Sequence, residues 1–212
     1  MLKDMKLEDF VEELASKSPA PGGGSVAALC ASLAAALSCM VFNLTQGMKG
    51  YNEYSEDKKK SIDYSLLEAT EIKEAFIKLM EEDVIAFLEL METFKLPKSE
   101  EKEIKFRKEK IQKGYIKALE IPLEVANSAM KIYDHVEIAV MHGNKNAISD
   151  AGVAAILTQA SIEAAVLNVK INLSSIKDEE YKKRIKEHCE YLLQQAAARK
   201  SEIITVVNSQ IQ

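Results

Sequence analysis

The segment from residue 18 to residue 48 contains no charged side chain, and this run constrains the fold more than any other feature of the chain. It is long enough to cross a membrane as a helix. However, it is rich in Ala, Ser and Cys and contains Asn43 and Thr45, so its transfer into lipid would be only weakly favourable. Small side chains also let neighbouring helices approach closely. We therefore expect a buried central helix and no membrane partner.

Helical periodicity extends over nearly all of the chain, and no segment alternates between apolar and polar residues for more than a few positions. The expected helices span residues 6–16, 24–48, 55–94, 99–141 with a break or kink near Pro122, 147–173, and the region after residue 178. A second, mostly apolar helix is the one at 147–173. The pattern predicts an all-α, up-and-down bundle of about six helices with the two small-residue helices at its centre. Without a linker-like stretch, residues 1–212 are expected to form one domain.

Composition and charge exclude several classes of function. The formal net charge of −5 argues against a nucleic-acid partner. The three cysteines are odd in number and have no C-x-x-C spacing, which favours reduced thiols in a cytoplasmic protein. The three histidines form no H-E-x-x-H motif, so we expect no metal site. The first 16 residues are charged and amphipathic, unlike a signal peptide.

A proline- and glycine-rich junction, SPAPGGGSVAAL, precedes the charge-free helix. Glycines let a ligand approach the backbone without meeting a Cβ, and the N-terminus of a helix offers free N–H groups. The alternative is a sharp turn with a serine that caps the helix. The spacing fits neither a dinucleotide-binding loop nor a Walker A loop. The candidate substrate-binding residues here are Pro21, Gly22, Gly23, Gly24 and Ser25.

Asp83 interrupts the apolar stripe of the long helix at 55–94. The other residues of this stripe are Ile72, Phe76, Leu79, Phe87, Leu90 and Phe94. Burial would raise the pKa of the Asp83 carboxyl, and the charge of Glu81 or Glu82 would raise it further. Such a carboxyl can both accept and donate a proton near neutral pH. The alternative is a structural aspartate paired with a buried cation or a backbone group.

A line of polar residues also runs along the helix at 147–173, formed by Asp150, Ser161, Asn168 and Asn172. These side chains must find partners in facing helices or in a ligand. The helix at 24–48 carries a similar line, formed by Ser25, Ser32, Cys39 and Asn43. The two lines could face and satisfy each other, or the first could bind a ligand. Asp150 lies at the mouth of its helix, which favours a ligand there, although it could also cap the helix.

Lys49 follows the charge-free helix directly after Gly47 and Met48. A cation at this place complements the negative end of the helix dipole. It could equally bind a carboxylate of the substrate. Both interpretations stay open on the sequence alone.

Together these segments resemble the formiminotransferase-cyclodeaminase family, including stand-alone cyclodeaminases and methenyltetrahydrofolate cyclohydrolases of folate metabolism. The resemblance covers nearly the full chain and is strongest at residues 18–29, 40–51 (MVFNLTQGMKGY), 83–98 (DVIAFLELMETFKLPK) and 143–173. It implies an all-helical protein, dimeric or higher, with folate sites near subunit contacts. The active-site aspartate of the family corresponds to Asp83, the first residue of D-x-x-A-F. Where the family usually has two basic residues, this chain has Met48 and Lys49.

The resemblance implies a folate one-carbon enzyme that converts 5-formiminotetrahydrofolate to 5,10-methenyltetrahydrofolate with release of ammonia. The alternative within the family is a cyclohydrolase that forms 10-formyltetrahydrofolate. Either reaction uses a tetrahydrofolate derivative as substrate and needs no metal or redox cofactor. A non-catalytic helical scaffold is the alternative from another class. A scaffold would have leucine where this chain has Asp83 and the two asparagines.

Overall fold

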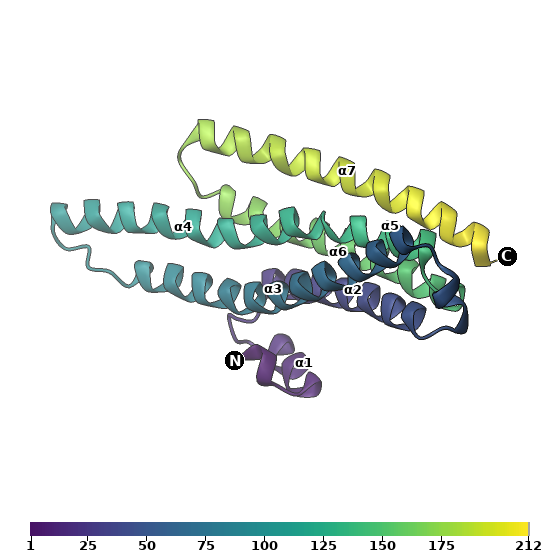
Figure 1. The fold of residues 1–212 in the computed structure, drawn as a ribbon. Coiled ribbons are helices and arrows are strands. Elements are labelled where there is room, and N and C mark those ends of the chain that lie inside the picture. The colour runs from purple at the N-terminus through teal and green to yellow at the C-terminus, as the bar shows by residue number, and fades with distance from the viewer. Residues whose placement is uncertain (212) are drawn as a thin grey trace.

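The computed structural model describes residues 1–211, which form a bundle of long α-helices joined by short loops (Figure 1). The α-helices are α1 (Leu7–Ala15), α2 (Gly23–Gln46), α3 (Glu56–Phe94), α4 (Glu101–Ala129), α5 (Ile132–His142), α6 (Ile148–Leu173) and α7 (Glu179–Ile211). Three short 3₁₀ segments complete the described chain: η1 (Leu2–Asp4), η2 (Lys49–Glu53) and η3 (Lys145–Ala147). Residues 1–211 contain no β-strand, so the predicted all-α fold is confirmed.

The two small-residue helices, α2 and α6, lie at the centre of the bundle as predicted. They pack against each other, α2 also packs against α3, and α6 also contacts α4, α5 and α7. By length and composition alone, α2 and the segment Lys145–Leu173 could cross a membrane. However, 61% and 56% of their most apolar windows are buried within the protein. The apolar composition of both helices therefore serves the core of the bundle.

Two contacts show that α2 and α6 run in opposite directions. At one end, Gly23 at the start of α2 lies next to Asn168 near the end of α6. At the other end, the backbone N–H of Asn144, just before α6, donates to Oγ1 of Thr45 in the last turn of α2 at 2.8 Å. Because a helix rises by about 1.5 Å per residue, the two ends of this pair are separated by roughly 35 Å.

The predicted helix at 99–141 is divided, but not at Pro122 as expected. Helix α4 continues through Pro122 to Ala129, and α5 begins after Met130 and Lys131. Of the predicted break or kink, the break at Pro122 is wrong: the surrounding helices bury this residue, and a side chain from α6 hydrogen-bonds the carbonyl oxygen of Ala118 one turn earlier.

Arg199 on α7 contacts both sides of the break between α4 and α5. Its guanidinium donates to the backbone oxygen of Met130 at 3.3 Å. It also forms ion pairs with Asp134 and Glu137 of α5, both at 2.7 Å. A guanidinium suits this place because its planar set of donors can serve several acceptors at once.

The helix starts follow local sequence signals. Ser55 caps α3 by accepting a hydrogen bond from the backbone N–H of Lys58 at 3.4 Å. Glu100 and Glu103 form a capping box at the start of α4, so this helix starts slightly later than the predicted position at residue 99.

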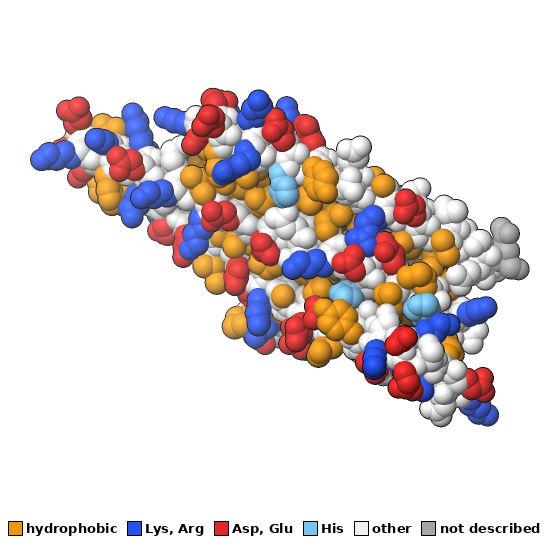
Figure 2. Space-filling view, turned by 45° about the horizontal axis from the view of Figure 1, so that its top comes forward, with side chains coloured by type: hydrophobic (Ala, Val, Ile, Leu, Met, Phe, Trp, Pro, Cys, Tyr) orange, Lys and Arg blue, Asp and Glu red, His pale blue; other side chains and the backbone are white. Residues whose placement is uncertain are grey.

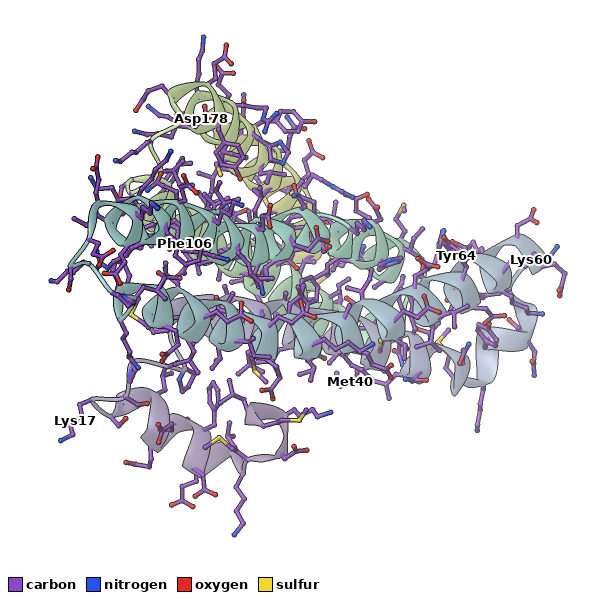
Figure 3. The ribbon with its side chains drawn as sticks, turned by 90° about the vertical axis from the view of Figure 1, so that its left-hand side faces the viewer. Lys17, Met40, Lys60, Tyr64, Phe106 and Asp178 are labelled. Carbon is purple, nitrogen blue, oxygen red and sulfur yellow. The ribbon has the colours of Figure 1, made fainter. Side chains whose placement is uncertain are left out.

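Helix α1 lies to one side of the bundle, and Figures 1 and 3 agree in this placement. Figure 3 views the molecule from the end at which α3 connects to α4 and α6 connects to α7, and it labels Lys17 at the end of the α1 region and Asp178 just before α7. On the face of the molecule in Figure 2, acidic and basic side chains are interspersed with apolar ones.

Candidate functional site

A cavity of about 410 Å³ opens where the start of α2 meets α3, α4 and the end of α6. Its size is within the range of small-molecule sites in proteins. The residues that line it are Pro19, Ala20, Gly22, Gly23, Gly24, Asp83, Val84, Phe87, Leu90, Met91, Tyr115, Ala118, Asn168, Ile171, Asn172, Ser174 and Ser175. The structure therefore brings the glycine junction, Asp83 and the two asparagines together, although they come from three different helices.

Asp83 projects from α3 against the first turn of α2, and Gly24 makes this approach possible. A Cβ atom at Gly24 would lie 2.6 Å from Cγ and 2.8 Å from Oδ2 of Asp83, which is closer than real Cβ contacts. At Gly23 a Cβ would lie 3.0 Å from Nδ2 of Asn168, and at Gly22 it would meet nothing within 4 Å. Thus Gly24 is required by the carboxyl group, whereas Gly22 leaves an open approach to the cavity.

Ser25 holds the carboxyl group of Asp83 in place. The hydroxyl of Ser25 donates to Oδ2 of Asp83 at 2.9 Å, and the backbone N–H of Ser25 donates to the same carboxyl group. This N–H belongs to the first turn of α2, where it has no acceptor within the helix. Asp83 therefore supplies the acceptor that the helix start lacks.

Burial raises the pKa of the Asp83 carboxyl, and the two hydrogen bonds from Ser25 act in the opposite direction. The expected contribution of Glu81 or Glu82 is absent from these causes. Glu81 instead accepts a hydrogen bond from the backbone N–H of Lys3, and Glu82 is exposed. In residues 1–211 no Lys, Arg or His forms an ion pair with Asp83, so the expected alternative of pairing with a cation is not met. The expected alternative of pairing with a backbone group is met, because the carboxyl accepts from the backbone N–H of Ser25.

The Ser25 hydroxyl has two acceptors within reach, because its Oγ also lies 3.2 Å from the backbone oxygen of Met80. When Asp83 is ionised, the hydroxyl can donate to the carboxylate. When Asp83 is protonated, the carboxylic acid can donate to Oγ while the hydroxyl turns to Met80. The site can thus satisfy both protonation states of Asp83 without moving a heavy atom, as a group that shuttles a proton requires.

The two asparagines present acceptors to the cavity. Nδ2 of Asn168 donates to the backbone oxygen of Ala164 at 2.8 Å, and Nδ2 of Asn172 donates to those of Ala118 and Asn168 at 3.1 and 3.0 Å. Within residues 1–211 no protein group donates to either Oδ1 atom. With the carboxyl of Asp83, these amide oxygens favour a ligand that is rich in N–H donors or carries positive charge.

The two polar lines do not face each other. On α2, Ser25 meets α3, the hydroxyl of Ser32 donates to the backbone oxygen of Lys73 at 3.1 Å, and Sγ of Cys39 lies 3.6 Å from Oγ1 of Thr70. Asn43 is exposed. The polar line of α2 therefore packs against α3. On α6, the Ser161 hydroxyl donates to the backbone oxygen of Ala27 at 2.7 Å.

Some residues of the predicted site lie outside the cavity. Pro21 is buried within the junction, and Ser25 is fully buried next to Asp83, so neither residue lines the cavity. Lys49 and Asp150 are at the opposite end of the α2–α6 pair, beyond the end of α2 and in the first turn of α6. Within one chain, the structure does not bring these two residues to the cavity, because the antiparallel packing separates the ends of each helix.

The cavity also contains residues that the sequence did not single out for binding. Phe87 and Tyr115 supply aromatic walls. The loop after α6 is tied down by Gln112 of α4, which donates to the backbone oxygen of Ser175 at 3.0 Å and accepts from the backbone N–H of Lys177 at 2.9 Å. Phe87 lies one helical turn after Asp83, so its position in the helix could have marked it as a residue of the cavity. No local signal marks Gln112, because its partners lie about sixty residues away.

In residues 1–211 no three His, Cys, Asp or Glu side chains come close enough together to hold a metal ion. The polar side chains that line the cavity are those of Asp83, Tyr115, Asn168, Asn172, Ser174 and Ser175.

Comparison with known proteins decides the family. A model of the formiminotransferase-cyclodeaminase family matches residues 6–191. The chain belongs to this family. It is 35% identical over 206 residues to a methenyltetrahydrofolate cyclohydrolase of Methylorubrum extorquens, and the match covers 97% of both chains. It is 34% identical over 188 residues to the formimidoyltransferase-cyclodeaminase of Gallus gallus, which covers 88% of this chain and 34% of the chicken protein.

A solved structure agrees with the assignment to the formiminotransferase-cyclodeaminase family. The crystal structure of a formiminotetrahydrofolate cyclodeaminase from Thermotoga maritima superposes with a TM-score of 0.86 at 27% identity, over the full length of both chains. The family expected from the glycine junction and the Asp83 segment is therefore confirmed, and so is the helical architecture.

Proposed function

We propose that this protein is a folate one-carbon enzyme, and that it converts 5-formiminotetrahydrofolate to 5,10-methenyltetrahydrofolate and ammonia. The observation that carries the proposal is the Asp83 carboxyl, which lines a cavity of folate-binding character and is supported by Ser25 in either protonation state. Two of the similar proteins, the methenyltetrahydrofolate cyclohydrolase and the formiminotetrahydrofolate cyclodeaminase, are named for tetrahydrofolate substrates.

The reaction requires one proton to move between two nitrogens. N10 of the folate attacks the formimino carbon, a C–N10 bond forms, and N10 gives its proton to the carboxylate of Asp83. The protonated Asp83 then donates this proton to the former imino nitrogen, the bond from carbon to that nitrogen breaks, and ammonia leaves. The substrate enters as an amidinium and the product is a methenyl cation, so charge is conserved. The restored carboxylate lies beside the cation and stabilises it.

The rest of the cavity fits the shape and polarity of a pterin. Its flat ring suits the apolar walls formed by Val84, Phe87 and Met91. Its N–H groups suit the amide oxygens of Asn168 and Asn172. Gly22 and Gly23 let the ring approach the backbone of α2. Neither step uses an oxidant, a reductant or a metal, so the proposal includes no cofactor.

Methenyltetrahydrofolate cyclohydrolase activity is the second candidate, and one observation favours it. The Methylorubrum relative with that name matches 97% of its own length to this chain, as a stand-alone protein of the same size. In that reaction water adds to the methenyl carbon. Asp83 would accept one proton of this water and pass it to N5 as the C–N5 bond breaks, while the second proton of the water is released to solvent as the formyl C=O forms. The same cavity would bind the cation.

We further infer that the protein forms a homodimer through the outer faces of α2 and α6. On α2, Leu33, Met40 and Leu44 share one helix face and are exposed. On α6, the exposed residues of one face are Val153, Ile156, Leu167 and Ile171. Because α2 and α6 pack side by side, we infer that these exposed apolar faces adjoin, and adjoining exposed apolar faces favour an interface with a second copy. Ile171 also lines the cavity, so a partner on this surface would reach the cavity rim.

This dimer would explain how Lys49 and Asp150, which are distant from the cavity of their own chain, bind substrate. In an antiparallel, two-fold arrangement, the far end of one α2–α6 pair lies beside the cavity end of the other. The partner subunit's Lys49 could then bind the carboxylate of the folate tail, and the partner subunit's Asp150 could accept hydrogen bonds from the aminopyrimidine edge of the pterin. In this arrangement both predicted substrate-binding residues act across the subunit contact.

The test is an absorbance assay of the methenyl chromophore, with formimino- and methenyltetrahydrofolate as separate substrates. A cyclodeaminase produces the chromophore from the first substrate, and a cyclohydrolase consumes it when given the second. Asp83→Asn should lower turnover by roughly 10²- to 10⁴-fold and leave folate binding largely intact. If neither substrate reacts and folates do not shift the melting temperature, the chain is a helical scaffold and the proposal fails.

A further inference from the structure

Pro122 is a buried residue in the middle of α4, a position where proline is unusual. In a regular helix the carbonyl oxygen of residue 118 accepts a hydrogen bond from the N–H of residue 122. Proline has no N–H, so the Ala118 carbonyl lacks its ordinary donor. Ala118 lines the cavity, so the carbonyl group that lacks its helical donor lies at the wall of the site.

Asn172 of α6 supplies a donor to this carbonyl group. Its Nδ2 donates one hydrogen to the backbone oxygen of Ala118 at 3.1 Å and the other to the backbone oxygen of Asn168 at 3.0 Å. A rotated amide would place its oxygen against two carbonyl oxygens, which repel it. The two carbonyls therefore determine the orientation of the amide, and Oδ1 remains as the acceptor that Asn172 offers to a ligand.

We propose that Pro122 is a positioning residue for substrate recognition: it leaves the Ala118 carbonyl free to bind Nδ2 of Asn172, so that the amide oxygen of Asn172 faces an N–H group of the ligand. The inference rests on the proposed folate activity for the identity of the ligand. It assigns a role to a residue that lies behind the cavity wall and touches no substrate.

The first test is Pro122→Ala, which restores an N–H that competes for the Ala118 carbonyl. Alanine is the best helix former, so α4 should persist. KM for the tetrahydrofolate substrate should rise by about 3- to 10-fold, the effect of one weakened hydrogen bond. The kcat should stay within about twofold, because Asp83 and Ser25 are unchanged. A change in melting temperature with no change in KM would show that Pro122 is only structural and would overturn the proposal.

A double-mutant cycle tests the link to Asn172. Asn172→Ala removes the acceptor, so the combined variant Pro122→Ala with Asn172→Ala should have the KM of Asn172→Ala alone. Additive effects would overturn the proposal.

The orientation can also be measured without substrate. In ¹⁵N-edited NMR spectra, the side-chain amide of Asn172 is assigned by its absence in Asn172→Ala. In Pro122→Ala, one of its two proton signals should move upfield as the bond to Ala118 weakens. Unchanged signals would refute the proposal. If the wild-type protein neither binds nor converts folates, the proposed function fails, while these amide signals still decide whether Pro122 orients Asn172.

Discussion

Removal of the Ser25 hydroxyl should shift the pH dependence of catalysis. Ser25→Ala deletes the hydrogen bond of 2.9 Å that stabilises the ionised carboxyl of Asp83, while the backbone N–H bond and the burial remain. A hydrogen bond to a charged group contributes about 1.5–3 kcal/mol, and each 1.4 kcal/mol corresponds to about one pKa unit. The pKa of Asp83 should therefore rise further, because the ionised carboxyl loses a donor that stabilises it.

The sign of the effect follows from the role of Asp83 as a base. The free enzyme must hold Asp83 ionised, so kcat/KM decreases as the pH falls through the pKa of this carboxyl. Asp83 is the only carboxyl among the described residues that line the cavity, so this acid limb reports on it. In Ser25→Ala the limb should move to higher pH, and kcat/KM below the limb should fall by about tenfold, the effect of about 1.5 kcal/mol of lost stabilisation of the ionised carboxyl.

Ser32→Ala is the matched control. Ser32 is also a buried serine on the face of α2 that meets α3, and its hydroxyl donates to the Lys73 backbone oxygen at 3.1 Å. Its removal should reduce stability to a similar degree and leave the pH profile unchanged. If the acid limb of Ser25→Ala coincides with that of the wild type, Ser25 does not set the pKa of Asp83 and the reasoning is refuted.

Two further predictions concern the glycine junction and the subunit contact. In an alanine series, Gly22→Ala should leave kcat unchanged and weaken folate binding modestly, because its methyl group meets no protein atom but lies at the approach to the cavity. Gly23→Ala should weaken folate binding several-fold by displacing Asn168, and Gly24→Ala should lower kcat by about 10²-fold or more because it displaces Asp83. Steady-state kinetics that show equal effects on kcat at all three positions would contradict this order. Sedimentation at micromolar concentration should show at least a dimer, and Leu44→Glu on the apolar face should dissociate it with loss of activity, whereas Leu67→Glu on exposed α3 should not. A fully active monomer would remove the shared site and leave the role of Asp83 intact.

The helices and the position of Asp83 within its apolar stripe could be predicted because helical periodicity is a local property. The same is true of the central placement of α2 and α6, since their uncharged, small residues are stable only when buried and closely packed. The composition of SPAPGGGS indicated a site at the start of α2. The sequence thus determined the fold class, the family and the one carboxyl group among the described residues that line the cavity.

Tertiary structure alone decided which groups meet. Ser25 reaches Asp83 and Met80 across more than fifty residues, and nothing in the sequence showed that the polar side of α2 would pack against α3 instead of α6. Pro122 did not end its helix because tertiary burial outweighed its local cost. Asp150 shares α6 with the two asparagines and Lys49 follows shortly after α2, but antiparallel packing places both at the far end from the cavity. Side-chain pairing over such separations depends on how rigid helices pack together, which local patterns do not specify.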